Sequence, residues 1–333
     1  MERAGRGGQG GDGRGGPDRA HGFLDRPLSA GTLEEAAAAL KAGGLVILPT
    51  ETVYGLAADA SDPMAVAAIF EAKGRPRFNP LIAHVEDLPA AEKIAIFDDR
   101  ARALAEAFWP GPLTLVLPVR DRSRVCDLAR AGLDTVAVRA PGHAKARELI
   151  ARFGGPVVAP SANRSGRPSP TTFADAMEET GFAAAAALDG GPCAVGVEST
   201  VAAVLDRVRL LRPGAVTRAE LAEVAGPLAE AGGEGGRSPG RLTLHYAPDA
   251  PVRLEADAPQ PGEAFIGFGP NSPAGGWNLS ASGDLREAAA NLFRMLREAD
   301  RTKPAAIAVA PVPHEGLGEA LNDRLRRAAG AVG

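Results

Sequence analysis

Three basic side chains lie within five residues of one another in the first third of the chain. Lys73, Arg75 and Arg77 precede an Asn-Pro dipeptide, and residues 73–84 contain neither aspartate nor glutamate. Cations at the end of a helix often do no more than complement the helix dipole. Three of them together, without an acidic neighbour, indicate a binding site for an anion.

Other polar side chains follow short apolar runs that are expected to be strands. Ligands in open α/β sheets lie outside the carboxyl ends of the strands, so such positions are candidates for substrate contacts. Serine and asparagine at these places can also be ordinary turn formers. The candidates are Thr50 after residues 45–48, His84 after residues 81–83, and Ser161 and Asn163 after residues 154–159.

Two arginines lie where their charge requires a partner. In the expected strand 134–140, Thr135 and Arg139 are two strand repeats apart and should point to the same face. Arg139 is flanked by apolar residues, and a partly buried arginine is normally paired with an anion. A bound ligand and a structural salt bridge both remain open as that partner. Arg212 lies at the far end of an expected hairpin over residues 198–214.

A helix start provides a further candidate for an anion site. Ser169 and Pro170 are expected to open a helix, with the serine as N-cap and the proline in the first turn. The free backbone N–H groups at such a start suit a phosphate.

The elements that must position these residues indicate an α/β fold. Apolar runs alternate with capped helices, for example one that begins after Asp62 and ends at Gly74. From Ala231 the sequence is rich in glycine and proline, as in a linker, but it also carries Tyr246, so we expect it to dock. The expected division is a disordered tail at 1–22, a catalytic domain at 23–225, a linker and active-site lid at 226–260, and a smaller α/β domain at 261–333.

Composition limits the class of protein. The chain has 333 residues, a net charge of -4 and 23% charged residues, which gives no support for a nucleic-acid or membrane-surface protein. Two distant cysteines exclude a disulfide framework and fit a reducing cytoplasm. No signal peptide or apolar run long enough to span a membrane is recognisable, so we expect a soluble, cytoplasmic protein.

The order of motifs resembles one known family. PTETVYGL, KGRPRFNPL, WPGPLT, DTVAVR, PSAN, GVEST and LLRPG are followed by SPG and HYAP. Together they are similar to the YrdC-type family, in particular the long, two-domain threonylcarbamoyl-adenylate synthases. The resemblance implies a twisted, open, mixed sheet with a smaller Rossmann-like α/β domain joined by a docked linker. Where the family has lysine and tyrosine between SPG and HYAP, this chain has Arg241-Leu242-Thr243-Leu244.

The resemblance also implies an activity and roles for residues. L-threonine, bicarbonate or CO2, and ATP with Mg²⁺ would become threonylcarbamoyl-AMP and pyrophosphate, for a downstream threonylcarbamoyl transferase that modifies tRNA. Lys73 and Arg75 would be catalytic and hold ATP, and the L-threonine contacts would come from Thr50, His84, Arg139 and Ser199. The other ATP contacts would be Arg77, Thr135, Ser161, Asn163, Ser169, Arg212 and Tyr246.

The residues themselves support nucleotidyl transfer, because several cations must hold the phosphates and neutralise the leaving pyrophosphate. The sequence has no GxxxxGK[ST] loop, so side chains must replace a P-loop. Two alternatives remain. A relative that handles carbamoyl-adenylate would need cysteine-rich zinc motifs, which two cysteines do not provide. An RNA-binding module is disfavoured by the ordinary net charge, and weak double-stranded RNA binding is the most we expect.

Overall fold

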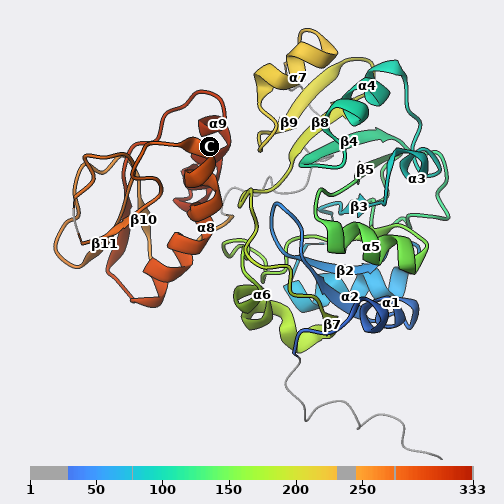
Figure 1. Cartoon of the computed structure of the whole chain (residues 1–333), viewed down its shortest axis with the longest axis horizontal. Coiled ribbons are helices and arrows are strands. Elements are labelled where there is room, and N and C mark those ends of the chain that lie inside the picture. Colours follow the sequence, from blue (N-terminus) through green and yellow to red (C-terminus); the bar gives the residue numbers. More distant parts are fainter. Residues whose placement is uncertain (1–28, 77, 231–244, 274, 332–333) are drawn as a thin grey trace, which may run out of the picture.

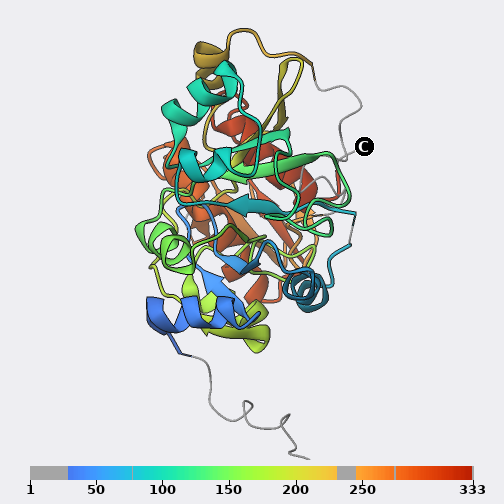
Figure 2. The same cartoon turned by 90° about the vertical axis from the view of Figure 1, so that its right-hand side faces the viewer.

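The computed structural model describes residues 29–76, 78–230, 245–273 and 275–331. The expected disordered tail, Arg77 and residues 231–244 of the expected linker lie outside these described residues. The chain forms a larger and a smaller α/β unit, and the smaller one lies to one side of the larger (Figure 1). A quarter turn places it behind the larger sheet (Figure 2).

The larger sheet has nine strands within the described residues. They are β1 (Leu45–Leu48), β2 (Gly55–Asp59), β3 (Ile82–His84), β4 (Leu113–Pro118), β5 (Thr135–Arg139), β6 (Val157–Val158), β7 (Ala184–Ala187), β8 (Thr200–Val204) and β9 (Val208–Arg212). Their order in the sheet is β7-β1-β2-β6-β3-β5-β4-β8-β9. Pairs such as β1–β2 are antiparallel and pairs such as β3–β5 are parallel, so the sheet is mixed, as expected.

Helices cover both faces of this sheet. They are α1 (Leu33–Lys41), α2 (Pro63–Lys73), α3 (Leu88–Glu92), α4 (Asp99–Phe108), α5 (Ala144–Phe153), α6 (Phe173–Thr180), the 3-10 helix η1 (Gly181–Ala183) and α7 (Arg218–Ala225). Alternate residues of β1 divide between two cores: Leu45 and Ile47 pack in the core that includes α2, and Val46 and Leu48 in the core of α1 and α5. A strand covered on both faces reads as a continuous apolar run, which explains the sequence at 45–48.

The smaller unit is a four-stranded parallel sheet within the described residues, in the order β10-β13-β11-β12. Its elements are β10 (Val252–Arg253), β11 (Glu263–Gly267), β12 (Trp277–Asn278), α8 (Leu285–Arg301), β13 (Ala306–Val309) and α9 (Gly318–Ala328). Helices α8 and α9 lie on the side of the smaller unit that faces the larger one (Figure 1). Val53 and Val197 of the larger unit pack in the apolar core around α8, so the two units share an apolar contact.

Two expectations differ from the structure. Helix α6 is capped by Thr172, whose side chain accepts from Asp175 N, so Ser169 is not the N-cap. Residues 252–253, within the expected linker, pair as β10 with β13.

Candidate active site

A single pocket brings together most of the residues that the sequence singles out. Its walls come from the segments after β1, α2 and β6, the ends of β3, β5 and β9, the residues before β8, and residues 245–246. The threonine-side candidates and several ATP-side candidates therefore share one cavity. The expected residues in its walls are Thr50, Arg75, His84, Arg139, Ser161, Ser199, Arg212 and Tyr246.

Arg139 ends β5 and is 3% exposed. Its Nη2 donates to Glu51 Oε1 at 2.6 Å, its Nη1 to Thr52 Oγ1 at 3.0 Å and its Nε to the Gly111 carbonyl at 3.1 Å. The structural salt bridge left open by the sequence is therefore present. A guanidinium has five N–H donors. These contacts use three of them, so Arg139 is held in place and can still donate into the pocket.

His84 and Thr50 are also fixed by backbone contacts. The Nδ1 atom of His84 lies 3.1 Å from the Ile82 carbonyl, which can only accept, so this nitrogen carries the proton. Burial, with Arg139 acting in the same direction, lowers the pKa of His84 to about 3. A neutral His84 therefore presents Nε2 as an acceptor. Thr50 Oγ1 donates to the Val53 carbonyl at 2.6 Å and shapes the turn after β1.

Arg75, which lines the pocket, and Lys73, which is buried and is not among the lining residues, both donate to neutral carbonyl groups. Lys73 Nζ donates to the carbonyls of Ser161 and Asn163. Arg75 donates to the carbonyls of Asn79 and Pro80, at 3.5 and 3.3 Å. Neutral acceptors do not neutralise a positive charge, so this side of the pocket suits an anion.

Burial is the main cause of the pKa shifts of these cations. It lowers the pKa of Lys73 well below the usual range, with Arg75 acting in the same direction. It also lowers the pKa of Arg75 to about 10, although Tyr246 acts in the opposite direction. Both shifts show that these positive charges are poorly solvated, and an anionic ligand would relieve that cost.

Two buried ionised groups at the pocket were not predicted. Glu198 lines the cavity, and it accepts from Ser169 Oγ and, at 3.0 Å, from Arg324 Nε. Arg324 belongs to α9 of the smaller unit and is fully buried. A sequence signal for Arg324 exists, since it shares the apolar face of α9 with Leu321 and Leu325.

Residues 245–246 close part of the pocket wall. Tyr246 is 1% exposed, and its ring centroid lies 5.3 Å from that of Phe293 in α8. The Arg324 guanidinium carbon lies 5.6 Å from the same ring, which is a cation–π contact. Tyr246 has a φ of 63°, a left-handed conformation that is strained for tyrosine and typical of ligand clamps. His245, which was not predicted, lines the pocket beside it.

The remaining expected residues lie elsewhere. Thr135 is at the opposite end of β5 from Arg139 and is not among the lining residues. Asn163 lies behind the wall, where its Nδ2 donates to the carbonyls of Arg164 and Arg167, at 2.8 and 2.9 Å. Ser169 reaches the pocket only through Glu198. Arg77 lies outside the described residues.

Comparison with known proteins covers both units. Residues 38–214 match the Sua5/YciO/YrdC family, described as "Telomere recombination", and residues 216–330 match "Threonylcarbamoyl-AMP synthase, C-terminal domain". The chain belongs to the Sua5/YciO/YrdC family. Within this family, the threonylcarbamoyl-AMP synthase of Bacillus subtilis (strain 168) is 38% identical over 322 residues, covering 90% of this chain and 93% of that protein.

Other members of the Sua5/YciO/YrdC family are similarly close. The threonylcarbamoyl-AMP synthase of Pyrococcus abyssi is 40% identical over 319 residues, covering 89% of this chain and 93% of that protein. The crystal structure of P. abyssi Sua5 complexed with L-threonine superposes with a TM-score of 0.82 at 38% identity, and covers 90% of this chain and 94% of that one. The two-domain architecture expected from the sequence is therefore confirmed.

Two further findings concern the described residues alone. These residues contain no helix that is both long enough and apolar enough to cross a membrane. They also contain no group of three or more His, Cys, Asp or Glu side chains placed to hold a metal ion.

Proposed function

We propose that this protein is an L-threonylcarbamoyladenylate synthase, which converts L-threonine, bicarbonate or CO2, and ATP into threonylcarbamoyl-AMP and pyrophosphate. The observation that carries the proposal is one pocket in which Arg139 and His84 face the same cavity as Arg75 and Arg212. The first pair suits an amino acid and the second pair suits phosphates. The names of relatives that are 38–40% identical over both units support the same activity.

The proposed threonine site follows from the charges of its side chains. Arg139 would bind the carboxylate, because its planar guanidinium can donate two parallel hydrogen bonds. A cationic His84 could bind the carboxylate as well. A neutral His84 with Nε2 as acceptor suits the threonine ammonium or hydroxyl better. Thr50 and Ser199 would complete this side of the pocket.

The proposed ATP site lies on the cationic side. Arg75 and Arg212 would contact the phosphates directly, and Lys73 would act from behind the wall, where it holds the carbonyls of Ser161 and Asn163. Roles for Arg77, Thr135 and Ser169 remain predictions from the sequence. Because attack at phosphorus needs charge to be held in place, these cations would stabilise the departing pyrophosphate.

The donor groups fit Mg²⁺ only as a partner of ATP. Magnesium usually takes one or two carboxylates in addition to substrate phosphates. Glu198 is the carboxylate in the pocket wall, and Ser169 and Arg324 already occupy its two oxygens. The ion would therefore arrive on the phosphates, where it would neutralise part of their charge.

The proposed reaction needs no covalent enzyme intermediate. The threonine amine adds to CO2 and loses a proton, which gives a carbamate. A carbamate oxygen then attacks the α-phosphorus, and the bond to the pyrophosphate oxygen breaks. Orientation contributes most, because a labile nucleophile must be kept near its target and away from water. We propose that the product passes, in the cytoplasm, to a threonylcarbamoyl transferase that modifies tRNA.

An assay with labelled bicarbonate tests the proposal. The protein is incubated with threonine, ATP and Mg²⁺, and the products are separated by chromatography. We expect label in an adenylate that contains threonine, together with one pyrophosphate for each adenylate. Omission of threonine should remove both products. ATP cleavage that is independent of threonine, with no labelled adenylate, would contradict the proposed function.

A further inference from the structure

The turn between β6 and α6, residues 161–168, is held from inside the larger unit by Lys73. The Lys73 ammonium donates to the carbonyls of Ser161 and Asn163, and the Lys73 carbonyl accepts from Ser165 N at 2.8 Å. Ser161 lines the pocket, so the shape of this turn decides where the wall of the proposed ATP site lies.

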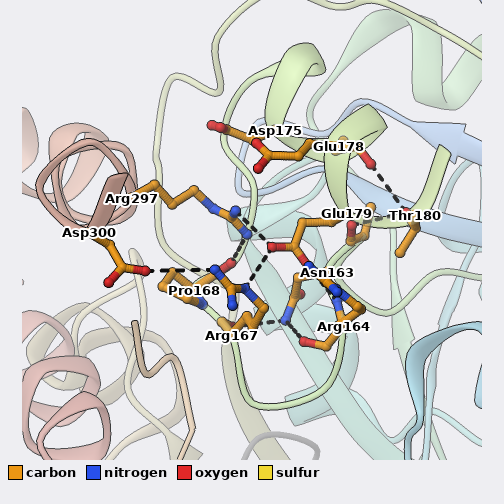
Figure 3. Close-up of polar contacts among 12 residues, drawn as sticks. Asn163, Arg164, Arg167, Pro168, Asp175, Glu178, Glu179, Thr180, Arg297 and Asp300 are labelled. Atoms are coloured by element: carbon orange, nitrogen blue, oxygen red, sulfur yellow. Dashed lines mark hydrogen bonds and ion pairs between the residues drawn. The ribbon is translucent and has the colours of Figure 1, made fainter. Parts of the chain in front are cut away.

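The opposite side of the same turn rests on one buried carboxylate, as Figure 3 shows. Glu179 of α6 is 2% exposed. Its Oε2 accepts from the backbone N–H of Arg164 at 3.0 Å, and its Oε1 accepts from Arg167 Nε at 3.0 Å. The side chain of Asn163 donates to the carbonyls of both arginines, so these contacts extend to the centre of the turn.

The smaller unit contributes the third partner of Glu179. Arg297 extends from α8, is 5% exposed, and donates from Nη1 to Glu179 Oε1 at 3.0 Å. Its Nη2 donates to the carbonyl of Pro168, the last residue of the turn. One side chain of the smaller unit therefore contacts both the turn and the carboxylate that supports it (Figure 3).

The charges of this cluster are linked to Lys73. Burial raises the pKa of Glu179, but the Arg164 N–H and then Arg297 outweigh it, so the pKa is lowered and the carboxylate is ionised. The same carboxylate raises the pKa of Lys73, against burial and Arg75. Removal of Arg297 would change both the geometry of the turn and the charge behind the pocket.

From these contacts we propose that Arg297 is a positioning residue for the nucleotide: through Glu179 and Pro168 it holds the 161–168 turn in the shape that binds ATP. This inference rests on the proposed function, because it takes ATP as the ligand at that wall. Coupling between sites is reciprocal. ATP should therefore also tighten the contact between the two units.

A matched control lies one turn further along α8. Arg301 also bridges α8 to α6, through 2.6 Å contacts with Asp175 and Glu178. Both partners lie on α6, outside the turn, and the Arg301 side chain is 49% exposed. Loss of Arg301 therefore removes an ion pair between the units without removing support from the turn.

The test compares the full-length wild type with Arg297→Met and Arg301→Met. Calorimetry gives the Kd of ATP with Mg²⁺ and, separately, the Kd of threonine. For Arg297→Met we expect ATP to bind about five- to tenfold more weakly, in the range of typical coupling between sites. We expect the threonine Kd to stay within about twofold, and Arg301→Met to change neither constant by more than that. ATP should also raise the unfolding midpoint of Arg297→Met less than that of the wild type.

Arg297→Lys provides a second, milder variant. A single ammonium keeps the charge but cannot reach Glu179 and Pro168 with a fixed fork. We therefore expect an ATP Kd between those of the wild type and Arg297→Met. A folding defect in the methionine variant alone would not produce this graded series.

Several outcomes would overturn the inference. Equal losses for ATP and threonine in Arg297→Met would indicate a general structural role, and an equal ATP loss in Arg301→Met would indicate nonspecific docking. If the wild type makes labelled adenylate and Arg297→Met binds ATP as tightly as the wild type does, the role of Arg297 is overturned and the proposed function stands. A wild type that binds ATP but makes no adenylate would instead contradict the function, while the Kd comparison would still decide the role of Arg297. A wild type that binds no ATP would overturn both.

Discussion

Arg139 and Arg75 are arginines of one pocket, the first buried and the second partly buried, and their surroundings differ. Arg139 is held by Glu51 and Thr52, whereas Arg75 donates to carbonyls. We expect Arg139→Lys to weaken threonine binding about tenfold or more and to leave ATP binding nearly unchanged, because an ammonium cannot make a two-pronged carboxylate contact. Calorimetry with each ligand measures this. Arg75→Lys should show the reverse preference, and equal losses for both ligands in Arg139→Lys would contradict the assignment.

The two buried histidines predict a pH dependence of stability. Burial lowers the pKa of His84 and that of His245 to about 3, while an unfolded imidazole has a pKa of about 6.5. Below about pH 6.5 the unfolded chain therefore binds protons that the folded chain does not. The stability that they contribute is complete above about pH 6.5 and is lost as the pH falls towards about 3, by at most roughly 1.4 kcal/mol per pH unit for each histidine.

Urea unfolding at pH 7.5 and pH 5.5 measures this loss. In His245→Asn the decrease in the free energy of unfolding should be smaller, because one of the two titrating groups is gone. A decrease as large as in the wild type would show that His245 does not contribute to it.

At the scale of elements, two residues near the start of α6 have different roles, one in stability and one at the site. Thr172 caps the helix, and Ser169 donates to Glu198 in the pocket wall. Thr172→Ala should lower the free energy of unfolding by about 1 kcal/mol, as loss of an N-cap does, with ligand binding unchanged. Ser169→Ala should instead weaken ligand binding, because it removes one of the partners that hold Glu198. Denaturation and calorimetry on both variants distinguish these effects, and a binding defect in Thr172→Ala would contradict the division.

Elements with strong local signals could be predicted. Helix α2 begins after Asp62 and ends at Gly74 because the cap, Pro63 and the left-handed glycine are all local. Strands β2 and β7 were not predicted, since GLAAD and AAAA have little β-propensity. They are strands because β2 pairs with β1 and β6, and β7 pairs with β1. The pocket walls could be predicted from polar residues after apolar runs. The partnership of Glu179 with Arg297 could not, because the two residues are 118 positions apart.

At the scale of the whole molecule, Tyr246 lies at the junction of the two units. Its ring lines the pocket and packs against Phe293 of α8. We expect Tyr246→Ala to reduce synthesis of threonylcarbamoyl-AMP by about tenfold or more, with more ATP cleaved per product formed, because water can then attack the α-phosphorus in place of the carbamate and give AMP and pyrophosphate. Tyr246→Phe keeps the ring contact and should retain most of the activity. The ratio of labelled adenylate to pyrophosphate measures this, and an unchanged ratio in Tyr246→Ala would contradict a closing role.

The contact between Glu198 and Arg324 also has a consequence for biosynthesis. Arg324 follows Glu198 by 126 residues. At a translation rate of about 5–20 residues per second, Glu198 leaves the ribosome roughly 6 to 25 s before its arginine does. During that interval the nascent larger domain must keep its sheet folded while the carboxylate lacks Arg324. The pocket wall is therefore completed late in synthesis, and a ribosome that stalls before α9 holds a chain with an unfinished site.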